Sequence, residues 1–147
     1  MSTSTRGLLA FRFEGLDYVT YNHSDSYPRG LGRGIVHFAQ AHLNGREAIR
    51  AFGRKLAALE WLSRPRDARS GCPQGVDLLH AIAAGRVSRI VHDRQLFRTC
   101  LDCEFAYILD LDAGVLEFWD LPERAESFPL ASISACAVGV MECGRRR

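Results

Sequence analysis

Alternating apolar and polar positions, interrupted by turns that contain glycine, predict two β-hairpins. The predicted strands are residues 7–13, 18–22, 105–110 and 115–119. Glu14–Asp17 connects the first pair, and Gly15 supplies a residue that accepts a positive φ. Leu111–Gly114 connects the second pair and also contains a glycine. Aromatic and β-branched residues are frequent in these segments, and such side chains favour the surface of a sheet.

Between the hairpins, apolar residues recur every three to four positions, which predicts helices. The predicted helices cover residues 31–43, 46–62 and 76–84. Asn44 and Gly45 separate the first two, because both residues tolerate the left-handed conformation that ends many helices. Gly53 lies inside the second helix, where it costs about 1 kcal/mol relative to alanine, and therefore indicates close packing. Residues 87–98 and 131–143 carry no clear pattern.

Two hairpins on either side of a helical middle predict an α+β fold, in which an antiparallel sheet built from the hairpins is covered by helices on one face. The length of 147 residues indicates a single domain over residues 1–147, with residues 1–5 and 143–147 as flexible tails. The N-terminus lacks a signal peptide, and no segment reaches the roughly 18 apolar residues of a membrane span. We therefore expect a cytoplasmic protein without membrane contact, in the host cytoplasm if a phage encodes it.

The formal net charge of +2 argues against a dedicated nucleic-acid-binding protein, which would need a strong basic stripe. The five cysteines have irregular spacing and do not resemble a secreted disulfide framework. Cys100 and Cys103 have the spacing of half a zinc site, but no second pair follows, so we interpret them as structural or free thiols.

The histidines do not predict a metal site either. His37 and His42 are five residues apart and do not share a helix face, and His80 is isolated in the sequence. We interpret His42, which lies on the apolar stripe, as a core or edge histidine. The sequence therefore predicts neither a metal nor a cofactor.

The richest polar segment is Thr20–Gly32, which connects a predicted strand to a predicted helix. The glycines from Gly30 to Gly34 at the start of that helix can expose backbone N–H groups to an anion, and the helix dipole adds positive charge there. Arg29 and Arg33 would complete such a site through bidentate contacts. In the alternative interpretation the segment is only a turn, held by hydrogen bonds of Asp25 and Ser26.

Parts of the chain resemble a group of small uncharacterised proteins of bacteriophages and bacteria. The resembling segments are Thr5–Gly7, the Thr-Tyr-Asn-His-x-Asp-Ser-Tyr-Pro block at Thr20–Pro28, Gly30–Gly32 and Phe105–Asp112. The resemblance implies a phage-type origin, and in that setting sequestration of a host signalling nucleotide or binding of a host defence protein. It implies no catalytic residue.

The leading hypothesis is a non-enzymatic protein that binds an anionic or nucleotide-like ligand. The predicted ligand contacts are Arg6, Asn22, His23, Asp25, Ser26, Tyr27, Arg29 and Arg33. The alternative is a small hydrolase or transferase in which His23 is the general base, with Asp25 and Ser26 beside it. A third hypothesis is an interaction protein that inhibits a host protein or forms a homo-oligomer through the apolar segment Ala131–Val140.

Overall fold

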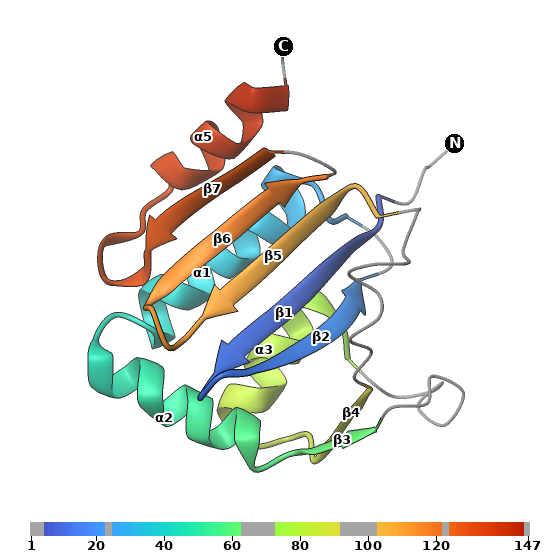
Figure 1. Cartoon of the computed structure of the whole chain (residues 1–147), viewed down its shortest axis with the longest axis vertical. Helices are drawn as coiled ribbons and strands as arrows, with labels where there is room; N and C mark the ends of the chain where they lie inside the picture. The colour runs from blue at the N-terminus through green and yellow to red at the C-terminus, as the bar shows by residue number, and fades with distance from the viewer. Residues whose placement is uncertain (1–4, 23–24, 63–72, 92–102, 122–123, 146–147) are drawn as a thin grey trace.

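The computed structural model describes residues 5–22, 25–62, 73–91, 103–121 and 124–145. The strands are β1 (Gly7–Phe13), β2 (Leu16–Asn22), β3 (Glu60–Leu62), β4 (Arg89–Val91), β5 (Phe105–Asp110), β6 (Val115–Asp120) and β7 (Arg124–Pro129). The helices are the π-helical turn η1 (Pro28–Gly32), α1 (Arg33–His42), α2 (Arg46–Ala57), α3 (Gly75–Ala84), the 3-10 turn η3 (Leu130–Ser132) and α5 (Cys136–Arg145). Figure 1 shows these helices behind and beside a five-stranded sheet, which confirms the α+β class.

The ends of the helices differ from the sequence prediction in three places. The second helix ends at Ala57, because residues 60–62 instead form β3, which pairs in parallel with β4. Gly45 precedes α2 in extended conformation, with φ −176°, and is not a left-handed cap. At the C-terminus α5 continues to Arg145, so the predicted tail is helical to that point.

The main sheet has the strand order β2-β1-β5-β6-β7, and both predicted hairpins are present in it. The prediction of an antiparallel sheet is wrong at its centre, where β1 and β5 pair in parallel with Gly7 opposite Phe105. Both strands bury residues on both faces of the sheet. Such near-continuous apolar runs are typical of parallel strands, which are covered on both sides.

The turns of the two hairpins are joined by one carboxylate. Glu14 and Gly15 form a two-residue turn in which both φ values are positive, +52° and +78°. This geometry matches the twist of the strands and explains why a glycine is needed. Asp112, from the other hairpin, accepts hydrogen bonds from the backbone N–H groups of Glu14 at 2.7 Å and Gly15 at 3.0 Å.

An ion-pair cluster lies beside these turns on strands β1, β2, β5 and β6. Arg12 contacts Asp17 at 2.9 Å, Asp110 at 3.0 Å and Glu117 at 3.7 Å. The hydrogen bond to Asp17 raises the pKa of the Arg12 guanidinium above its ordinary value, against the opposing effect of burial. The cluster therefore holds the strand ends together across the parallel pair.

The main core lies between one face of the sheet and the helices α1, α2, α3 and α5. Its largest fully buried side chains include Phe11, Phe38, Phe105, Tyr107 and Phe118. The opposite face of the sheet carries a smaller buried cluster, formed by Leu8, Ala10, Val19, Cys103, Ala106 and Ile108. Among the described residues, no helix has the length and apolar character needed to cross a membrane.

At Gly53, α2 approaches the sheet closely, because a Cβ at this position would overlap the ring of Phe13. We expect Gly53→Ala to lower the free energy of unfolding by about 1–3 kcal/mol, the usual cost of overpacking a core. The measurement is chemical denaturation monitored by circular dichroism.

Gly139→Ala is the matched control, because Gly139 is an exposed residue of α5 with no atom within 4 Å of a new Cβ. Alanine there should stabilise the protein by up to about 1 kcal/mol through its helix propensity. Stabilisation of both variants to the same extent would show that Phe13 does not press on α2.

Candidate functional site

The loop between β2 and η1 is held on its inner side by buried contacts. The amide of Asn22 donates to Ser26 Oγ at 2.7 Å, and both residues are buried, at 7% and 0% exposure. The Ser26 N–H donates to the Thr5 carbonyl at 3.1 Å, and the Tyr107 hydroxyl donates to the Ser26 carbonyl at 2.8 Å. Gly7 lies so close that a Cβ there would be 2.7 Å from Ser26 Cβ. Asn22 and Ser26 therefore fix the loop to the sheet.

The prediction that the glycine run presents exposed N–H groups to an anion is wrong. The N–H groups of Gly30 and Gly32 donate to the Tyr27 carbonyl at 2.9 and 3.5 Å, and that of Leu31 donates to the Asp25 carbonyl at 2.8 Å. Glycine is required at position 30 because a Cβ would overlap the Asp25 carbonyl oxygen. The glycines of η1 therefore permit close packing of the loop.

The remaining predicted contacts do not gather at one point. Asp25, Tyr27, Arg29 and Arg33 are exposed, whereas Arg6 is half-buried just before β1. His23 lies outside the described residues. Two sets can thus be distinguished among the described members: Asn22 and Ser26 point into the protein, and Arg29 and Arg33 point outward.

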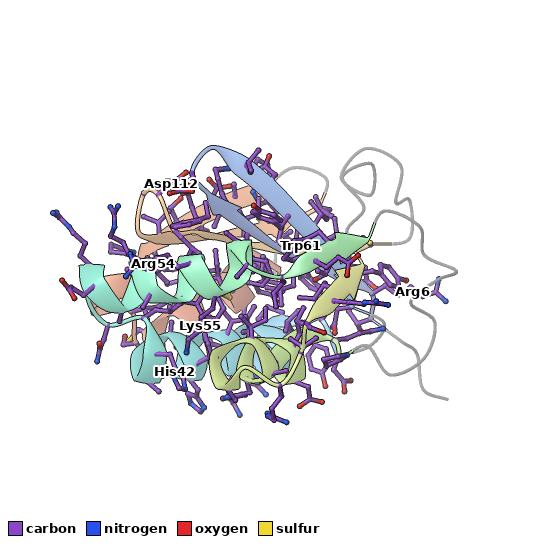
Figure 2. The ribbon with its side chains drawn as sticks, turned by 90° about the horizontal axis from the view of Figure 1, so that it is seen from below. Arg6, His42, Arg54, Lys55, Trp61 and Asp112 are labelled. Carbon is purple, nitrogen blue, oxygen red and sulfur yellow. The ribbon has the colours of Figure 1, made fainter. Side chains whose placement is uncertain are left out.

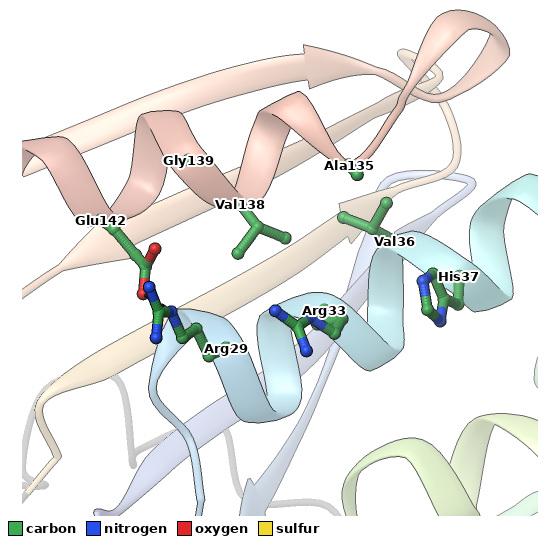
Figure 3. A pocket seen from close by; sticks show the side chains of 8 residues that line it. All are labelled: Arg29, Arg33, Val36, His37, Ala135, Val138, Gly139 and Glu142. Carbon is green, nitrogen blue, oxygen red and sulfur yellow. Dashed lines mark ion pairs between the residues drawn. The ribbon is translucent and has the colours of Figure 1, made fainter.

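Arg29 and Arg33 line a groove between α1 and α5, which Figure 3 shows from close by. The cavity has a volume of about 200 Å³. Its lining residues are Arg29, Arg33, Val36, His37, Ala135, Val138, Gly139 and Glu142. Arg29 Nε and Glu142 Oε2 form an ion pair at 2.6 Å across one end of the groove.

The charges of the groove favour an anion. Arg29, Arg33 and His37 follow one another at four-residue spacing along η1 and α1, and all three line the groove (Figure 3). Glu142 neutralises Arg29, whereas Arg33 makes no ion pair with any described residue. Two guanidinium groups against one carboxylate leave the groove with a net positive charge, which is suited to a phosphate or carboxylate group.

Sequence reasoning missed His37 and Glu142 as members of this groove. The four-residue spacing of Arg29, Arg33 and His37 was a usable signal, because residues four apart share one side of a helix. Glu142 had no such signal, since α5 is remote in sequence and its apolar pattern is weak.

Among the described residues that line the groove, none is a serine, threonine or cysteine. Ser26, the hydroxyl considered for catalysis, is fully buried and is bonded to Asn22. Its oxygen is therefore not placed to attack a substrate in the groove.

The apolar C-terminal segment is divided between the core and the surface. Ile133, Ala137 and Val138 belong to the main core, while Val140 stays 41% exposed. Ala131 and Ala135 are exposed as well, so only part of the apolar surface expected at a homo-oligomer contact is covered by the chain itself. Among the cysteines, Cys103 is disulfide-bonded, which differs from the predicted thiol, and Cys136 and Cys143 are free.

Compared with known proteins, the chain matches no family model, no curated protein and no solved structure. The comparisons therefore leave the expected resemblance to phage proteins untested.

Substitution of Ser26 tests whether this residue stabilises the fold. We expect Ser26→Ala to lower the free energy of unfolding by about 1–3 kcal/mol, because the buried amide of Asn22 loses its acceptor. Thermal or chemical denaturation measures this loss, with the exposed Ser132→Ala as a control that should stay within about 0.5 kcal/mol of wild type. An unchanged stability of Ser26→Ala would contradict the role of Ser26 in fixing the loop.

Proposed function

We propose that this chain is a non-enzymatic binding protein, which holds a small anionic group in the groove between α1 and α5. The observation that carries the proposal is the row of Arg29, Arg33 and His37 along one wall of the cavity. Arg33 would make the main bidentate contact, because its guanidinium has no competing carboxylate among the described residues.

The size of the cavity narrows the class of ligand. Its volume of about 200 Å³ is below the roughly 300–1,000 Å³ of pockets that enclose a whole drug-sized molecule. A phosphate or carboxylate group fits such a space, and the remainder of a larger ligand would lie outside it. A host signalling nucleotide, as the phage setting implies, would therefore bind by its phosphate, with its base outside the groove.

Glu142 would act as an internal competitor for the ligand. Its carboxylate already occupies Arg29, and its side chain is only 25% exposed, against 62% for Arg29. A bound anion would have to share Arg29 with this carboxylate or displace it. The affinity of the groove for an anion therefore depends on the strength of the Arg29–Glu142 pair.

Removal of the Arg33 guanidinium tests the proposed contact. We expect Arg33→Ala to weaken binding of inorganic phosphate by about tenfold or more, since one charge-assisted hydrogen bond is worth at least about 1.4 kcal/mol. Isothermal titration calorimetry with inorganic phosphate, and with AMP as a second probe, measures the affinity.

Arg50→Ala is the control. Arg50 is an exposed arginine on α2, and its substitution removes the same charge at a position outside the groove. It should keep the affinity of the wild type within about twofold, as expected for a remote exposed charge screened by salt. Equal losses in both variants would indicate unspecific attraction of anions, and absence of phosphate or AMP binding to the wild type at millimolar concentration would refute the proposal.

Removal of the competing carboxylate should have the opposite effect. We expect Glu142→Gln to strengthen phosphate binding several-fold, because Arg29 becomes available and a negative charge leaves the groove. The same calorimetric titration measures it, and a melting curve verifies that the variant is folded. Weaker binding in this variant would mean that Glu142 supports the ligand and does not compete with it.

A further inference from the structure

Two histidines from different helices meet on the side of α1 that faces α3. The ring centroids of His42 on α1 and His80 on α3 are 5.9 Å apart, with an angle of 78° between the ring planes. Both side chains are exposed, and Figure 2 shows His42 on α1 at the lower edge of that view. The pair is separate from the groove, which lies between α1 and α5.

Phe38 holds both rings in place. Its own side chain is 1% exposed, so its position is set by the core. The His42 ring stacks on it at 4.6 Å and 27°, and the His80 ring meets it edge-on at 5.3 Å and 82°. Both imidazoles therefore pack against the same buried ring.

Packing between α1 and α3 sets the separation of the pair. One turn before Phe38, Gly34 allows close approach of the helices, because a Cβ there would overlap Val76 of α3. Four residues after Val76, His80 reaches Phe38 and His42. The distance between the imidazoles is thus built into the helix interface.

This separation suits a shared metal ion. Metal–nitrogen bonds of about 2.0–2.1 Å to each ring place two coordinating imidazole centroids roughly 5–6 Å apart at tetrahedral or wider angles. The observed 5.9 Å falls within that interval.

The chemistry of the pair indicates which metal it would take. Among the described residues, no Asp, Glu, Cys or further His completes a group of three or more possible ligands. Imidazole without carboxylate favours nickel, copper and zinc over magnesium and calcium, which prefer oxygen ligands. We propose that His42 and His80 form a two-histidine site for one divalent transition metal ion, with water in the other positions, which links α1 to α3.

The test is titration of untagged protein with Ni²⁺ alone, followed by calorimetry and by the melting temperature. Binding to the folded state stabilises it by mass action, so the melting temperature should rise with the Ni²⁺ concentration. Mg²⁺ at the same concentration should leave it unchanged. We expect one ion per chain at this site, and both His42→Ala and His80→Ala should each weaken binding at least tenfold.

His37→Ala is the matched control, because it removes an exposed histidine of the same helix outside the pair. It should keep the Ni²⁺ affinity of the wild type. Full affinity in His42→Ala or His80→Ala would overturn the proposal, as would equal losses in all three variants. The experiment compares Ni²⁺ affinity and not stability alone. If the two rings served only in packing, His42→Ala and His80→Ala would be folded and would bind Ni²⁺ as tightly as the wild type.

Discussion

The parallel pairing of β1 with β5 joins the two hairpins into one sheet, and the positions of the other elements depend on it. Both strands lie at the centre and bury residues on both faces. Apolar burial on two faces is the largest contribution that a single strand can make to the core. At the C-terminal end of the two strands, Asp112 and Arg12 add polar contacts that keep the hairpins in register.

The other end of this pair carries the loop that leads into the helices. Ser26 is enclosed by β1, β2 and β5, through its contacts with Gly7, Asn22 and Tyr107. These contacts fix the point at which the chain leaves the sheet, so the direction of η1 and α1 follows from them. Polar residues that look like ligand contacts in the sequence thus serve to hold the outward-facing arginines in position.

Helix α1 then presents different chemistry on two sides. On the side toward α5, Arg33 and His37 of α1 line the groove together with Arg29 of the preceding turn η1. The side toward α3 carries His42, which meets His80 over Phe38. Because the core holds α1 from both the sheet and the neighbouring helices, each set of side chains faces its partner helix at a defined distance.

Local patterns were sufficient for the two hairpins, the positive φ of Gly15 and the close packing at Gly53. The hairpins and their turns depend on residues that are neighbours in the chain, whereas only the structure shows that Phe13 packs on Gly53. Packing between distant segments alone decided the parallel pair, the inward direction of Ser26, and the partners Glu142 and His80. Ser26 and Tyr107, for example, are hydrogen-bonded at a sequence separation of 81. Residue type and spacing report the local backbone, but which side of a loop is buried is decided by whatever element packs against it.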